Sequence, residues 1–125
     1  MTPVFQTRFG APHGNCFAAA VVSIVGGDIL GFPDLSDLVY DGSEANAERH
    51  KRVASYLLER GFSIVSLKNT GYLPWGYTVG VGVGCESKLP HACVYLDGKE
   101  VHDPSPDGRG LREGDVWYLI YLRER

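Results

Sequence analysis

Residues 14–27 read GNCFAAAVVSIVGG, and they predict a short helix that is buried on all sides. The three consecutive alanines favour helix, and the near absence of polar side chains from Cys16–Val25 is typical of a helix with no solvent-facing side. Asn15 is an N-cap type of residue, and Gly26-Gly27 predict the end of the helix. Cys16 is therefore expected in its first turn.

The chain around this segment predicts the α+β class. A second helix is expected over residues 44–60, with Gly61 as the residue that ends it. After Gly61 the spacing of apolar residues changes to the one typical of strands. Asp97-Gly98 predicts a tight hairpin turn. The glycines at 80, 82 and 84 predict close approach of a neighbour, with the buried helix as candidate. Helices followed by an antiparallel sheet indicate one α+β domain over residues 1–125, with strands expected at 62–67, 77–83, 91–96, 99–102 and 116–122.

Composition excludes several function classes. The net charge of −3 argues against a nucleic-acid partner, which requires a basic face. No apolar stretch approaches the roughly 18 residues that span a bilayer, so we expect no membrane partner, and no signal peptide is visible at the N-terminus. The 3 cysteines form no disulfide framework, which predicts a reducing, cytoplasmic setting.

Cys16 is the candidate nucleophile. A cysteine reacts as its thiolate, and a helix N-terminus favours negative charge through its dipole and its free backbone N–H groups. A thiolate nucleophile also needs a histidine, which must itself be oriented by a carboxylate or an amide.

The predicted hairpin supplies that pair. His91 opens one of its strands and Asp103 follows the other, about six residues from the turn on each side. Antiparallel neighbours have Cβ atoms about 5 Å apart, so we expect the Asp103 carboxylate to reach Nδ1 of His91. The adjacent His102 is expected on the other side of its strand, as a packing or surface residue.

Three short motifs in this order resemble the papain-like cysteine peptidases. They are Gly14-Asn15-Cys16-Phe17-Ala18, His91-Ala92-Cys93-Val94 and Val101-His102-Asp103-Pro104. The closest branch is the bacteriocin-leader-processing peptidases and related small bacterial and phage proteins. The resemblance implies a papain-like fold in which Cys16 is the nucleophile, His91 the base and Asp103 the orienting residue.

The same resemblance assigns further roles. It implies that Gln6 donates to the oxyanion together with the backbone N–H of Cys16, although ten residues is a long separation for this pair; Asn15 is the alternative amide. Asn15 and Trp75 are candidates for substrate binding. Metal ligation by Cys85, His91 and Cys93 is not expected, because their spacing fits no zinc motif, and no cofactor is implied.

The function expected from the resemblance is hydrolysis of a peptide or isopeptide bond in a peptide or protein substrate, through a thioester on Cys16. Two alternatives stay open. The same triad could pass the acyl group to an amine or thiol, as in transglutaminase-like or acyltransferase chemistry. A papain-like domain can also act as a catalytically silent binding module, and the reactivity of Cys16 would distinguish that case.

Overall fold

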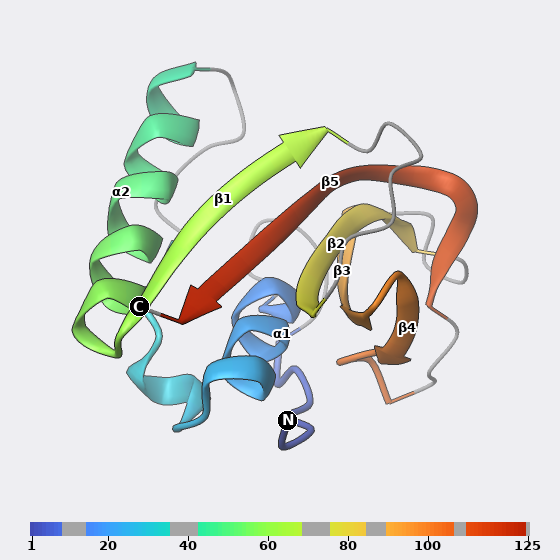
Figure 1. The fold of residues 1–125 in the computed structure, drawn as a ribbon, viewed down its shortest axis with the longest axis horizontal. Coiled ribbons are helices and arrows are strands. Elements are labelled where there is room, and N and C mark those ends of the chain that lie inside the picture. Colours follow the sequence, from blue (N-terminus) through green and yellow to red (C-terminus); the bar gives the residue numbers. More distant parts are fainter. Residues whose placement is uncertain (9–14, 36–42, 69–75, 85–89, 107–109, 125) are drawn as a thin grey trace.

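The computed structural model describes residues 1–8, 15–35, 43–68, 76–84, 90–106 and 110–124. Its elements are helix α1 (Cys16–Val25), the 3₁₀ turn η1 (Ile29–Gly31), helix α2 (Ser43–Glu59) and five strands. The strands are β1 (Phe62–Lys68), β2 (Tyr77–Gly84), β3 (Pro90–Leu96), β4 (Lys99–His102) and β5 (Leu111–Glu124). The predicted α+β class is confirmed, and the order of helices and strands is as expected (Figure 1).

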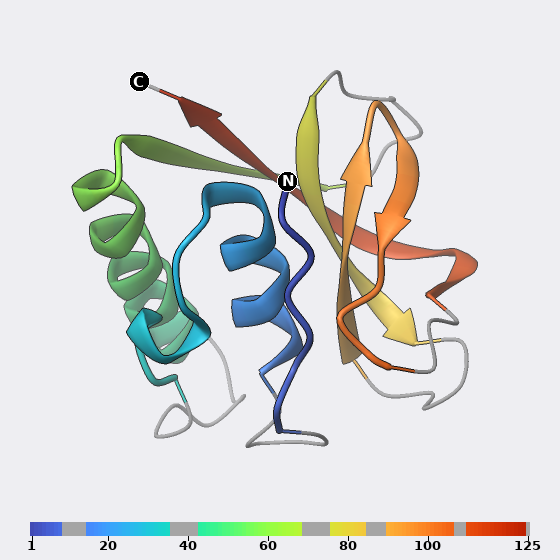
Figure 2. The ribbon, with the colours of Figure 1, turned by 90° about the horizontal axis from the view of Figure 1, so that it is seen from below.

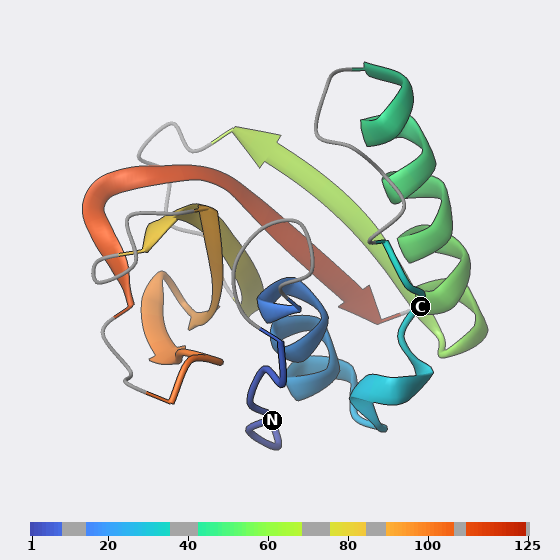
Figure 3. The same ribbon diagram turned by 180° about the vertical axis from the view of Figure 1, so that it is seen from behind.

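The five strands form one antiparallel sheet in the order β1-β5-β2-β3-β4. Strand β5 is longer than the predicted 116–122, and its register with β2 shifts twice. The sheet bends strongly, as its view from below shows (Figure 2). α2 packs on β1, whereas α1 packs on β3 and β2. In the view from behind, α1 lies in front of the sheet (Figure 3).

Helix α1 is buried as the sequence predicts. Its residues 18–23 are all buried, and Val21 and Val22 are completely inaccessible. It packs on the β2 and β3 residues that point to its side of the sheet, which are Val79, Ala92 and Val94. Gly26 ends the helix with a φ of 85°, a conformation that favours glycine. The first residues of α1 and β3 lie at the same end of the molecule (Figure 2).

The glycine prediction is right about close approach and wrong about the neighbour. A Cβ on Gly80 would lie 2.5 Å from Cε2 of Tyr95, so the aromatic ring from β3 takes this space. Tyr95 pairs with Thr78, two residues from Gly80 along β2, and the ring crosses diagonally. Val79, the neighbour of Gly80, belongs instead to the face that packs on α1.

Ser23 is the polar residue that fastens the N-terminal segment to α1. Its side chain is completely buried. Its hydroxyl donates to the carbonyl of Ala19 at 2.7 Å and accepts from the N–H of Val4 at 2.9 Å. The N–H of Thr2 donates to the Ser23 carbonyl at 3.0 Å. Ser23 therefore sets where the first residues run along the helix.

Replacing Ser23 by alanine is expected to lower the free energy of unfolding by about 1–2 kcal/mol, since the Val4 N–H loses its acceptor. Urea denaturation followed by far-UV circular dichroism measures this. The control is Ser55→Ala on the exposed side of α2, for which a change within about 0.5 kcal/mol is expected. Equal effects of the two substitutions would contradict the role of Ser23.

Candidate functional site

Cys16, His91 and Asp103 are brought together at the end of the molecule where α1 and β3 begin. Nε2 of His91 and Oδ1 of Asp103 are 2.6 Å apart, and the Cys16 side chain is close enough to His91 to raise the pKa of its ring. Cys16 is half-buried. The side chains of His91 and Asp103 are 11% and 5% exposed, so this pair is largely shielded from water.

The carboxylate of Asp103 contacts the other ring nitrogen of His91 than the one predicted. Asp103 accepts from Nε2 and not from Nδ1. A ring with Nε2–H on the carboxylate has Nδ1 left for the sulfur, as acceptor from a thiol or, when doubly protonated, as donor to a thiolate. The pair is the expected one, and only the assignment of the two nitrogens is wrong.

A β-bulge places Asp103 on the side of the sheet that carries His91. In β3 and β4 Leu96 pairs with Lys99 and Tyr95 with Glu100, but Val94 pairs with His102. One residue of β4, Val101, is therefore extra, and its side chain is 44% exposed. A regular hairpin would pair Ala92 with Asp103 and turn the carboxylate toward the core, because a shift of one residue reverses every side chain. The bulge removes that mismatch.

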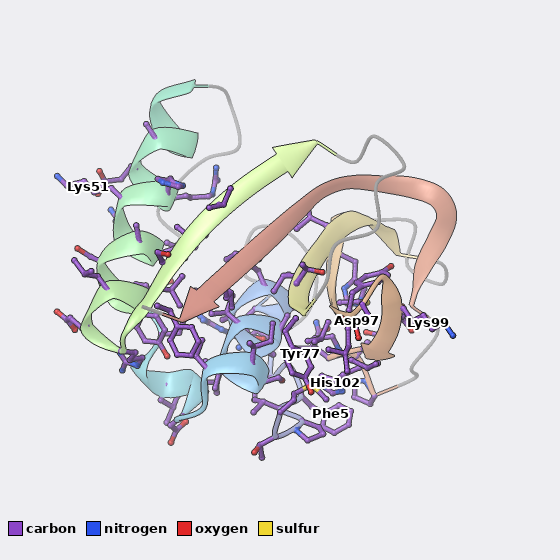
Figure 4. All side chains as sticks on the ribbon, viewed as in Figure 1. Phe5, Lys51, Tyr77, Asp97, Lys99 and His102 are labelled. Atoms are coloured by element: carbon purple, nitrogen blue, oxygen red, sulfur yellow. The ribbon has the colours of Figure 1, made fainter. Side chains whose placement is uncertain are left out.

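The same register turns His102 to the opposite side, as expected for a packing residue. His102 is buried, and its Nε2 donates to the carbonyl of Val4 at 2.7 Å. Its ring meets that of Phe5 edge to face, with centroids 5.1 Å apart, and the two side chains lie beside each other in Figure 4. His102 thus holds the N-terminal segment and is not the base.

Backbone donors hold the Asp103 carboxylate in place. Oδ1 also accepts from the N–H of Ser105 at 2.9 Å, and Oδ2 accepts from the N–H of Gly110 at 2.6 Å. Burial by itself raises the pKa of Asp103, but the hydrogen bonds from His91, Ser105 and Gly110 lower it below the usual range. Asp103 is therefore an anion fixed in orientation at neutral pH.

His91 in turn is held in its charged form. Burial lowers the pKa of His91, but the hydrogen bonds to Cys16 and Asp103, together with the negative charges of both, raise it from 6.5 to about 9. A positive imidazolium between a sulfur and a carboxylate is the arrangement in which a thiolate is stabilised. The site can therefore hold a proton donor beside the Cys16 sulfur at neutral pH.

This pKa gives a stability prediction with a definite sign. The folded value lies above the unfolded one, so the stabilisation is complete below pH 6.5 and is lost as the pH rises through about 9. The free energy of unfolding is expected to fall by roughly 1–3 kcal/mol over that window. Urea denaturation at both ends of the window measures it, and His91→Gln is the control. An equal fall in the His91→Gln variant would contradict the prediction.

The two amide candidates have partners within the chain. Asn15 is buried at the N-cap position, yet its side chain makes no cap hydrogen bond. Oδ1 of Asn15 accepts from the N–H groups of Thr7 and Arg8, each at 2.9 Å, and Nδ2 donates to Oγ1 of Thr7 at 2.8 Å. Asn15 therefore stands at the predicted N-cap position, but its side chain orders the segment before α1.

Gln6 lies beside the loop that carries the carboxylate. Its backbone N–H donates to the carbonyl of Pro104 at 2.9 Å, which fixes it one residue from Asp103. Nε2 donates to the carbonyl of Arg8 at 3.1 Å, whereas Oε1 is buried with no hydrogen-bond partner among the described residues. The amide nitrogen carries two N–H donors, so donation to an oxyanion is compatible with the contact to Arg8. Trp75 and Cys85 lie outside the described residues.

Cys93 is the member of this cluster to which the sequence analysis gave no role. Its thiol is completely buried. Ligand atoms of Cys93, His91 and Asp103 all lie within 4.8 Å of one another, the one such group among the residues whose positions are described. The signal was present in the sequence, because residues 91 and 93 of one strand point to the same side.

Comparison with known proteins gives no match: no family model, curated protein or solved structure is significantly similar to this chain. Within the described residues, no helix has the length and apolar character needed to cross a membrane.

Proposed function

We propose that the chain is a papain-like cysteine hydrolase that cleaves a peptide or isopeptide bond. The observation that carries this proposal is the series Cys16–His91–Asp103, in which a helix-start sulfur lies beside an imidazole that is hydrogen-bonded to a buried carboxylate. Each group has the role that its environment supports: nucleophile, acid–base catalyst and orienting anion.

The proposed reaction proceeds through a thioester. The Cys16 thiolate attacks the carbonyl carbon, and the C–O double bond opens to an oxyanion. Backbone N–H groups in the first turn of α1 lack intrahelical partners, and they stabilise that charge. The imidazolium of His91 gives its proton to the leaving amine, the C–N bond breaks and the acyl group stays on sulfur.

Water then completes the cycle. Neutral His91 takes a proton from water, the resulting hydroxide attacks the thioester carbonyl, and the carboxylic acid leaves as the C–S bond breaks. Asp103 stays ionised throughout and holds Nε2–H, so that Nδ1 faces the reacting atoms. The pKa of about 9 for His91 in the resting site matches the first step, in which a proton must be available.

The test is a screen of a peptide library, with isopeptide-linked lysines included, in which mass spectrometry identifies newly formed termini. We compare untreated protein with protein alkylated at Cys16 by iodoacetamide. Cleavage is expected only in the untreated sample. Cleavage that persists after complete alkylation of Cys16 would contradict the proposal, as would the absence of any cleaved bond.

A further inference from the structure

Beside the catalytic pair lies the thiol of Cys93, which the proposed reaction does not use. Cys93 follows His91 by two residues on β3, and its buried thiol lies within 4.8 Å of the ligand atoms of both His91 and Asp103. Thiol, imidazole and carboxylate are the three ligand types that Zn²⁺ takes in proteins.

The surroundings of Cys93 are negative. The Asp103 carboxylate lies within 4.8 Å of the Cys93 sulfur. The negative charge of Glu100 also acts on Cys93, and the Glu100 carboxylate occupies the space where Gly110 has no Cβ. Two carboxylates against a buried thiol favour the entry of a cation, and Glu100 is an exposed residue through which an ion can approach.

We propose that Cys93, His91 and Asp103 form a zinc site, and that bound zinc switches off His91 as a base. Three protein ligands leave the fourth tetrahedral position to water. Ligand atoms around zinc lie about 3.3–3.8 Å apart. Because Nε2 of His91 and Oδ1 of Asp103 are 2.6 Å apart, they must separate slightly as the ion replaces the proton between them.

The proton balance explains the switch. Binding releases the thiol proton of Cys93 and the Nε2 proton of the His91 imidazolium, two protons for each ion. The ring then carries its remaining proton on Nδ1, the nitrogen that faces Cys16. A metal-bound ring with Nδ1–H cannot accept a proton from a thiol or from water. The zinc site does not depend on the proposed hydrolase function, whereas the loss of His91 as a base rests on that function.

The experiment titrates the full-length chain with Zn²⁺ by calorimetry in two buffers of different ionisation enthalpy. One ion and about two released protons per chain are expected. Cys93→Ala and Asp103→Asn should each weaken binding at least about tenfold. Cys16→Ala is the matched control, because it removes the neighbouring thiol and leaves all three ligands; its affinity should stay within about threefold of the wild type.

Cobalt(II) gives a second readout that is independent of activity. A sulfur-to-cobalt charge-transfer band is expected in the wild type and in Cys16→Ala, and none in Cys93→Ala. If circular dichroism shows that Cys93→Ala is unfolded, the Asp103→Asn titration decides in its place. Absence of stoichiometric binding in the wild type would overturn the proposal. Binding lost in Cys16→Ala and retained in Cys93→Ala would overturn it too, because the ion would then sit on Cys16. The alkylation of Cys16 without metal tests the proposed function separately.

Discussion

Substitution of Cys16 by alanine is expected to abolish hydrolysis, with a loss of at least about 10³-fold in kcat/KM. In the proposed reaction the sulfur is the atom that forms the bond to the acyl group, and no other thiol described in the structure can replace it. Cys93 is completely buried, and burial together with nearby negative charge raises the pKa of its thiol. The measurement uses a substrate identified in the library screen, under conditions of excess substrate and, separately, in a single turnover.

Two variants make this result specific. Cys16→Ser keeps the shape of the side chain but replaces the thiolate by a poor nucleophile, so it should be nearly as inactive as Cys16→Ala. Ser55→Ala changes an exposed position on α2, a helix that packs on β1 at the opposite edge of the sheet from β4, and it should keep full activity. Activity of Cys16→Ala within a few-fold of the wild type would show that another residue carries the reaction.

Replacement of Asp103 by asparagine should lower kcat/KM by roughly 10²–10⁴-fold, in line with the loss of an orienting carboxylate in other triads. The neutral amide cannot stabilise an imidazolium, so the pKa of His91 should fall from about 9 toward its ordinary value of 6.5. NMR titration of the His91 ring measures this shift. The pH profile of the reaction should lose its plateau at neutral pH for the same reason.

The backbone contacts of Asp103 allow a structural effect to be separated from an electrostatic one. An asparagine carbonyl oxygen can still accept from the N–H of Ser105 or of Gly110, so the variant is expected to fold. Ser105→Ala is the matched control, because Ser105 contacts the carboxylate through its backbone N–H, which the substitution keeps. Unchanged activity in Asp103→Asn together with a lower pKa of His91 would contradict the role given to this charge.

Much of the fold follows from local patterns in the sequence. The composition of Cys16–Val25 predicts the buried helix at its observed bounds, and Asp97-Gly98 predicts the hairpin, in which Asp97 and Gly98 both have positive φ. Strand β5 was predicted too short, because it begins at Leu111 and residues 111–115 lack the apolar character of residues 116–122. The neighbour of Gly80 was missed because the diagonal contact of Tyr95 depends on strand order, which no local pattern gives.

The site was predictable in its residues but not in its geometry. The order of the three motifs along the chain predicted that Cys16, His91 and Asp103 form one site. In the structure these three residues lie together. The bulge at Val101 has no Gly or Pro to signal it, so the prediction assumed a regular hairpin. The partners of Asn15 and Gln6 lie in the irregular N-terminal segment, where backbone donors and acceptors cannot be located from composition.

The most direct test of the account is the rate at which iodoacetamide alkylates Cys16 as a function of pH, with the labelled residue identified by peptide mapping. The proposed role of Cys16 as nucleophile beside His91 predicts rapid labelling of Cys16 below about pH 7, which is lost in His91→Gln, while buried Cys93 stays unlabelled. Labelling that rises only above about pH 8, with the same profile in wild type and His91→Gln, would contradict the catalytic assignment and favour a domain that binds without reacting.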